Sequence, residues 1–167
     1  MTMIRRSATI LGLTLLLTAC GWSSDTGTGD IAPLDELTET YGCGYGFWVG
    51  NAAQTTALRF QYLGDDGQAS DADLPSDMWI VEMLDGQNLY ANWCDDVVEP
   101  GEPEPLVVRR LSVVDGTLTV IGDPPAPFDG GELTLRAEGL VLETPDGEMV
   151  ELGNITIENP TYGSFAG

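Results

Sequence analysis

Residues 132–152 read ELTLRAEGLVLETPDGEMVEL. Near the start of this stretch, Leu133, Leu135 and Ala137 alternate with polar residues, which is the pattern of a strand with one buried and one solvated face. Asp146-Gly147 then lies between two apolar runs. Asp-Gly in that position is the strongest short-range signal of a β-hairpin, because a type I′ turn needs positive φ at both central residues. The stretch therefore predicts two antiparallel strands joined by a tight turn.

The same signals recur along the chain. Asp85-Gly86 and Asp115-Gly116 also lie between apolar runs, and they predict hairpins that join 78–84 to 87–93 and 107–114 to 117–121. Glu138-Gly139 is either a bulge or a further turn, and the acidic, proline-rich residues 98–105 predict an exposed crossover. No segment after the first twenty residues shows a sustained helical stripe. We therefore expect an all-β domain, either an antiparallel β-sandwich or a small barrel, with about eight strands built from hairpins.

The first twenty residues have the form of an export signal. Arg5 and Arg6 precede an apolar run at 8–17, which is too short to cross a bilayer as a helix but matches a secretory signal peptide. The run ends in Leu17-Thr18-Ala19-Cys20. This tetrapeptide resembles the lipobox of bacterial lipoproteins. The resemblance covers only the leader, and it implies that Cys20 is lipidated and becomes the first residue of the mature chain.

The lipobox resemblance sets the expected organisation and location. Residues 1–19 would be the signal peptide, and 20–40 a flexible tether rich in Ser, Thr, Gly and Asp with one helical turn at 33–37. Residues 41–167 would form a single β domain. We expect the protein to be anchored by its lipid to the cell membrane or the outer membrane, on the extracytoplasmic face.

The composition excludes several kinds of chemistry. The chain has 27 Asp and Glu against 6 Lys and Arg, a formal net charge of -21, and neither histidine nor lysine. Histidine-based nucleophile pairs and metal sites are excluded, as is a Schiff-base lysine. The acidic surface also repels nucleic acid. We therefore expect no cofactor, no metal and no nucleic-acid partner, and a membrane contact made through the lipid.

Two cysteines remain once Cys20 carries lipid. Cys43 and Cys94 would lie in a compartment where disulfides persist, so a Cys43–Cys94 bridge is expected. It would close a loop of about 50 residues and contribute roughly 4 kcal/mol if unstrained. A metal site on two lone thiols without histidine is a poor alternative.

The stretch Tyr41–Gly50 is the least ordinary in the chain (YGCGYGFWVG). As a single strand it would place Tyr41, Cys43, Tyr45, Phe47 and Val49 on one face and glycines on the other. In one interpretation the aromatic residues wrap the disulfide in the core while the glycine face allows close packing. In the other, the glycines form the floor of a ligand groove into which Trp48 projects.

Two further features carry competing interpretations. Trp48, Trp79 and Trp93 would form a sugar-stacking platform if exposed on one face, or would supply core volume if buried. The acidic residues 65–73 are a solvated loop or a weak calcium site, although their spacing departs from the EF-hand pattern. The calcium candidates are Asp65, Asp66, Asp71 and Asp73.

The sequence favours a binding protein over an enzyme. The expected role is binding or envelope interaction, with an envelope protein or a glycan as partner. The alternative is a carboxylate-dependent hydrolase acting on envelope glycans. No catalytic residue can be named, because some pair among so many acids will lie at catalytic separation by chance. Glu82, in the apolar run 78–84, is the most unusual acid, and an edge position or a salt bridge to an arginine would account for it.

Overall fold

The computed structural model describes residues 31–64, 69–93, 95, 98–122, 131–158 and 161–162. The signal peptide, Cys20 and Cys94 lie outside the described residues, as do Asp65 and Asp66. The described residues from Ala32 onward belong to one compact unit. The single helical turn expected near residue 35 is present as the 3-10 helix η1 (Leu34–Glu36). The first strand begins at Glu39 and Leu37 is buried, so ordered structure starts before residue 41.

The domain is all-β, as predicted, and its main sheet has eight antiparallel strands. The order across the sheet is β1-β2-β3-β5-β6-β8-β9, and β4 pairs with β6 beyond the end of β5. A separate two-stranded sheet pairs β7 with β10. The strands are β1 (Glu39–Cys43), β2 (Gly46–Gly50), β3 (Thr56–Tyr62), β4 (Ala72–Leu74), β5 (Trp79–Gln87), β6 (Leu106–Ile121), β7 (Gly131–Glu132), β8 (Thr134–Glu143), β9 (Met149–Ile157) and β10 (Thr161–Tyr162).

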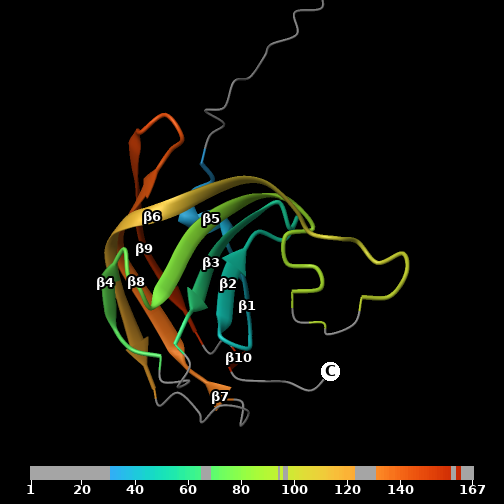
Figure 1. The fold of residues 1–167 in the computed structure, drawn as a ribbon, viewed down its shortest axis with the longest axis horizontal. Helices are drawn as coiled ribbons and strands as arrows, with labels where there is room; N and C mark the ends of the chain where they lie inside the picture. The colour runs from blue at the N-terminus through green and yellow to red at the C-terminus, as the bar shows by residue number, and fades with distance from the viewer. Residues whose placement is uncertain are drawn as a thin grey trace, which may run out of the picture. The chain divides into compact units, whose positions relative to one another are not determined.

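The eight strands form one strongly curled sheet, like half of a barrel (Figure 1). The predicted all-β class and the strand number of about eight are therefore confirmed. The described residues form half of a barrel, in place of two sheets packed face to face or a closed barrel. A curled sheet wraps around its own apolar face, so a second large sheet is not needed to cover the core.

The main core lies on one face of the curled sheet. Ladders of opposed side chains run across the strands, such as Phe47–Phe60–Val81 and Leu58–Met83–Leu111. All six side chains are at least 95% buried. Burial of each such side chain contributes about 1.5–3 kcal/mol relative to exposure, so these ladders supply much of the stability of the sheet.

One of the three predicted Asp-Gly hairpins is confirmed. β8 and β9 are joined at Asp146-Gly147, where Gly147 has a φ of 79° and its N–H donates to the Thr144 carbonyl at 2.8 Å. The Thr144 hydroxyl accepts from the N–H of Glu148 at 3.0 Å. Gly147 has a positive φ and open space around it, but Asp146 is not among the described residues with a positive φ. The hairpin is therefore present, whereas the type I′ turn, which needs positive φ at both residues, is not.

The hairpin predicted at Asp85-Gly86 is wrong, because β5 continues through both residues. The β5–β6 register shifts between them, which marks a β-bulge. A Cβ atom at Gly86 would lie 1.9 Å from the carbonyl oxygen of Leu106. The glycine is therefore needed for close approach of two backbones and not for a turn.

The hairpin predicted at Asp115-Gly116 is also wrong. β6 runs without a break over 16 residues, with register shifts on either side of Asp115 and a φ of 135° at Gly116. These bulges let one long strand follow the curl of the sheet. Glu138-Gly139 is likewise a bulge, in β8. The expected crossover at 98–105 is exposed and lies outside the strands.

In the part of the chain that the structure describes, the first part of β6 is paired along one edge only. β5 pairs with it from Leu106 onward, whereas β8 begins to pair only at Ser112. Within the described residues, no strand pairs with the other edge of 106–111. This segment also carries exposed apolar side chains, and Val108 is 73% exposed.

The Tyr41–Gly50 stretch is a hairpin of β1 and β2 and not one strand. The chain reverses at Gly44-Tyr45, where Gly44 has a φ of 56°. The reversal places Tyr41 directly opposite Trp48, with their rings 6.0 Å apart. β2 is buried along its whole length. Its two faces therefore face two different sets of side chains.

Candidate binding site

A second, smaller buried region lies on the opposite face of the sheet from the main core, here called the outer face. On β2, β3 and β5 the directly opposed residues Trp48, Arg59 and Glu82 share this face. Polar residues at alternate strand positions are expected to meet solvent. Here, however, Trp48 is only 3% exposed and Glu82 only 2%. A covering element is therefore needed.

The segment Asn88–Trp93, here called the covering segment, folds back over the outer face. Leu89 is fully buried and packs with Ala57 and Leu84, and Tyr90 and Trp93 lie against this cluster. The N–H of Leu89 donates to the Gln54 carbonyl at 3.0 Å, which fixes the start of the segment. The apolar contacts exclude water from the neighbouring polar groups.

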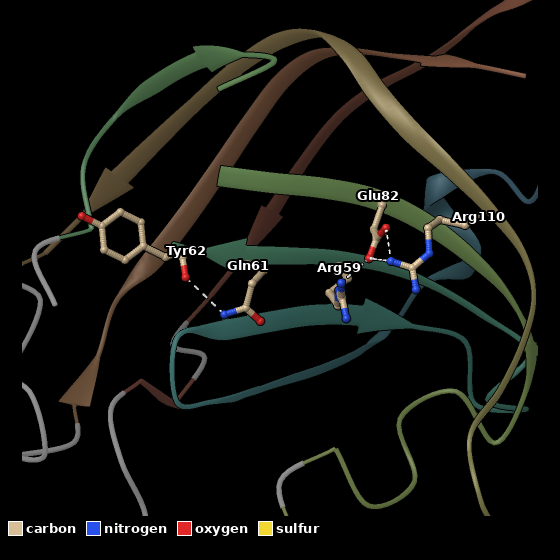
Figure 2. Close-up of polar contacts among 5 residues, drawn as sticks. All are labelled: Arg59, Gln61, Tyr62, Glu82 and Arg110. Carbon is tan, nitrogen blue, oxygen red and sulfur yellow. Dashed lines mark hydrogen bonds and ion pairs between the residues drawn. The ribbon is translucent and has the colours of Figure 1, made fainter. Parts of the chain in front are cut away.

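Glu82 is ion-paired with two arginines. Its Oε1 contacts Arg59 Nη2, and Arg110 Nη1 lies 2.9 Å from Oε1 and 2.7 Å from Oε2 (Figure 2). The Glu82 side chain is 3% exposed, against 26% for Arg59 and 52% for Arg110. The salt bridge anticipated for this acid is confirmed. Because one carboxylate faces two guanidinium groups, the cluster carries a net positive charge within a strongly acidic protein.

A pocket of about 180 Å³ lies beside this ion cluster. Arg59, Gln61 and Trp48 form part of its wall, and the Arg59 guanidinium lies 5.9 Å from the Trp93 ring centroid. Its described lining is Cys43, Gly46, Trp48, Arg59, Gln61 and Trp93, which includes no carboxylate. Gly46 has no side chain to fill the space, so the glycine floor proposed from sequence corresponds to this one residue.

Two buried N–H donors in the pocket-lining residues have no partner among the residues that the structure describes. They are Trp48 Nε1 and Arg59 Nε. An unsatisfied buried donor costs about 1–3 kcal/mol, so these two N–H groups lower the stability of this region. Gln61 donates its Nε2 to the Tyr62 carbonyl at 3.2 Å, which leaves Oε1 as an acceptor (Figure 2). The polar groups of the lining residues therefore include one free amide acceptor, whereas the two unpartnered donors are buried away from solvent.

The three tryptophans named from sequence do not share a face. Trp48 and Trp93 meet on the outer face at a centroid distance of 4.9 Å and an interplanar angle of 85°. Trp79 lies on the core face, 98% buried, and donates its Nε1 to the Ser70 carbonyl at 2.9 Å. An exposed platform of all three is therefore wrong, and only Trp48 and Trp93 line the pocket.

Cys43 lies at the end of β1 and lines the pocket. Its Sγ is 3.4 Å from the carbonyl oxygen of Trp93, the residue immediately before Cys94. Because Cys94 itself lies outside the described residues, the pairing remains a prediction.

Two of the four calcium candidates, Asp71 and Asp73, lie in the described residues and have roles in the sheet. Asp71 Oδ1 accepts the N–H of Val120 at 2.7 Å, and Asp73 lies in β4 opposite Thr117. Within the part of the chain that the structure describes, no group of three or more acidic or cysteine side chains could share a metal ion. In the same part, no helix is long and apolar enough to span a membrane.

Sequence reasoning missed Arg59, Gln61 and Arg110 as site residues. Arg59 and Gln61 alternate with Phe60 and Tyr62, so they read as an ordinary solvated strand face. The small number of basic residues was the feature of the sequence that could have identified them. When basic residues are this few and lie in strands beside a buried acid, ion pairing is the expected use of them.

Tyr90 is expected to make the stability of the domain depend on pH. Its hydroxyl donates to the Asn51 carbonyl, and its ring lies 5.2 Å from that of Tyr41. Burial raises the pKa of Tyr90 above its ordinary value, and the nearby Tyr41 and Glu39 raise it further, against a smaller lowering by a hydrogen bond with the Gln54 backbone. The folded protein therefore holds this proton more tightly than the unfolded chain does.

We expect the free energy of unfolding to fall as the pH rises above about 10. The contribution of Tyr90 is fully present below the unfolded pKa and is lost as the pH rises through the folded pKa. Urea unfolding of wild type and Tyr90→Phe at pH 8.5 and pH 11 measures this, with a smaller pH-dependent loss expected in the variant. Equal losses in the two proteins would contradict the assignment.

No family model, curated protein or solved structure matches this chain.

Proposed function

We propose that this protein is a lipid-anchored, extracytoplasmic binding protein whose ligand site is the outer-face pocket. The observation that carries this proposal is the pocket itself, whose wall combines two indole rings, a guanidinium and an amide beside an ion cluster with one more cation than anion. Binding pockets combine apolar walls with a few placed polar groups, as this one does.

Binding also accounts for the site better than hydrolysis does. A glycoside hydrolase needs two carboxyl groups flanking the bond to be cleaved. The described lining of this pocket has none, and both oxygens of the adjacent Glu82 are engaged by arginines. The groups in the described lining that can contact a ligand are a cation, an amide and indole rings.

A direct test observes the indole N–H groups by NMR during a ligand screen. The full chain, purified in detergent micelles, is titrated with small carboxylates, amides, amines, sugars and inorganic phosphate. We expect at least one class to shift the Trp48 Nε1–H resonance while leaving that of Trp79, on the core face, unchanged. Trp48→Phe should remove the resonance that shifts, which assigns it to Trp48, and the matched variant Trp79→Phe should preserve both the resonance and its shift. No response at Trp48 to any class would refute the pocket as a ligand site.

The anchor rests on the lipobox resemblance at residues 17–20. Palmitate labelling in a bacterial host tests it. We expect wild type to incorporate label and Cys20→Ala to incorporate none. Equal labelling of both proteins would remove the anchor from the proposal and leave the pocket unaffected.

We further propose that Cys43 and Cys94 are bridged in the exported protein. The support is the 3.4 Å distance from Cys43 Sγ to the carbonyl oxygen of the residue preceding Cys94. A bridge there would fasten the covering segment to the end of β1 and so hold one wall of the pocket. Intact mass after thiol alkylation, with and without reductant, is expected to show two additional alkylated thiols only after reduction. Alkylation of both thiols without reductant would contradict the bridge.

A further inference from the structure

We infer that one edge of β6 binds an extended segment of another protein, which adds a strand to the sheet and places a carboxylate opposite Arg110. The edge concerned is the side of residues 106–111 that faces away from β5, here called the β6 edge. None of these residues belongs to the described lining of the outer-face pocket, so this inference is independent of the proposed function.

The backbone of the β6 edge can accept another strand. β8 pairs with this side of β6 only from Ser112 onward, and among the described residues no strand pairs with it at 106–111. In an antiparallel ladder the N–H and C=O groups of alternate residues point to opposite sides of the strand. Part of the backbone of 106–111 therefore presents donors and acceptors at the β6 edge, in the line that β8 leaves at Glu143.

The side chains at the start of this segment are apolar and exposed. Leu106 is 54% exposed, Val107 37% and Val108 73%. Three consecutive exposed apolar residues are disfavoured on a protein surface unless they have a function. An added strand would cover part of these side chains, so burial of apolar area would add to the backbone hydrogen bonds.

The charge at the β6 edge favours an acidic partner. Arg109 is ion-paired with Asp85, whereas Arg110 shares Glu82 with Arg59, so these side chains hold one more cation than anion. Arg110 is 52% exposed, so it carries the accessible part of the excess positive charge. A carboxylate directly opposite Arg110 would form a cross-strand pair of opposite charge, which stabilises strand pairing.

The described acids near Arg110 leave this position to a partner. The ion pair that the described residues give Arg110 is the one with Glu82. Glu143 lies opposite Ser112, and the strand β8 ends there, so it does not reach the position opposite Arg110. Glu104 precedes Arg110 by six residues, up to about 20 Å along an extended chain.

A second copy of this chain fits the β6 edge less well than a separate acidic segment. Each copy has a formal net charge of -21, so two copies repel each other. The β5–β6 register shift also leaves Val108 without a partner in β5, which marks a bulge. A bulge increases the local twist and so disfavours flat pairing of long identical strands, whereas a segment of about six residues can follow the twist.

The test titrates short peptides into the full chain in detergent micelles, with the backbone amide resonances of 106–111 as the readout. The probe is the capped peptide TETVTV, whose glutamate lies opposite Arg110 when its valines lie opposite Val108 and Leu106 in an antiparallel pairing. TQTVTV and TKTVTV are its matched neutral and basic forms. We expect the glutamate peptide to bind about threefold more tightly than the glutamine peptide and about tenfold more tightly than the lysine peptide.

One pair of variants assigns the charge preference to Arg110. Arg110→Gln should bind the glutamate and glutamine peptides with equal affinity. Arg136→Gln removes the same charge from an exposed position in β8 and should preserve the threefold preference. The amide spectrum of each variant is compared with that of wild type before titration, so that a folding defect is recognised.

A second pair of peptides tests pairing through the backbone. TETVTV is N-methylated at its odd positions in one peptide and at its even positions in the other. Because alternate N–H groups of an added strand face β6, we expect one methylated peptide to lose at least about tenfold in affinity and the other to lose less. Binding of both with the affinity of the unmodified peptide would overturn strand addition.

The remaining outcomes are also decisive. Equal affinities of wild type for the three unmethylated peptides would overturn the acidic partner, and so would a preference that survives in Arg110→Gln. Peptide-induced shifts confined to residues outside 106–111, or no shift at all, would overturn the β6 edge as the binding surface. Changes at these amides with protein concentration alone, without peptide, would identify a second copy as the occupant and overturn the inferred partner.

Discussion

Replacement of Glu82 by glutamine is expected to destabilise the domain by about 2–3 kcal/mol, because it leaves the mostly buried Arg59 guanidinium without its counter-charge, whereas the half-exposed Arg110 can turn to solvent. Glu82 is the one charged side chain of the described residues that is buried, and both of its oxygens contact arginine nitrogens. Glutamine has nearly the same shape as glutamate, so packing is preserved. The loss of stability therefore measures the contribution of the Glu82 charge. Urea unfolding followed by circular dichroism measures the effect.

Two further variants separate the ion cluster from general charge effects. Glu104→Gln removes the same charge from an exposed position in 98–105 and is expected to change stability by less than about 0.5 kcal/mol. The double variant Arg59→Met, Glu82→Met replaces the buried pair with apolar groups and should recover most of the loss, since Arg110 is half exposed and can turn to solvent. A stability of Glu82→Gln within 1 kcal/mol of wild type would show that the cluster is not buried as described.

The second large effect is expected at Gly86. Alanine there would place its Cβ 1.9 Å from the Leu106 carbonyl oxygen and 2.9 Å from its carbonyl carbon, so two strands must move apart at the bulge. Overpacking of this kind costs typically 1–3 kcal/mol, and we expect about 3 kcal/mol because the obstructing atoms belong to the backbone. The free energy of unfolding of Gly86→Ala in urea gives the value.

Gly147 provides the matched control, because it also follows an aspartate. It lies in an open turn with nothing within 4 Å of a built Cβ, and its φ of 79° is one that asparagine tolerates. Gly147→Asn is therefore expected to cost less than about 1 kcal/mol. If both glycines behaved alike, Asp85-Gly86 would be a turn after all, as its sequence suggests.

This contrast shows how far the sequence predicts the fold. Alternation of apolar residues identified the strands and the all-β class, because one face of each strand meets the core. The structure that Asp-Gly adopts could not be predicted from the neighbouring residues, because the same dipeptide lies in a turn at residue 146 and in a bulge at residue 85. Which of these forms depends on the Leu106 backbone, 20 positions away, and no local pattern reports that contact.

The candidate site was less predictable for a related reason. Arg59 and Gln61 lie on the polar face of an alternating strand, and the sequence gives no sign that residues 88–93 fold over that face. Cys43 and Trp48 were singled out correctly as unusual, but as parts of one long strand. The hairpin at Gly44 changes which side chains they meet. Burial of a polar face is a long-range property of the chain.

Among the described residues, the edge of β6 at 106–111 that faces away from β5 has no partner strand, and this matters where many copies of the protein meet. An unpaired, apolar strand edge is a template for self-association between copies, by the same backbone pairing that builds amyloid. Here Pro105 precedes the strand and cannot donate a hydrogen bond to a neighbour, and Arg109 and Arg110 interrupt the apolar run. We therefore expect Arg109 and Arg110, which form ion pairs with Asp85 and Glu82, also to oppose aggregation through this edge.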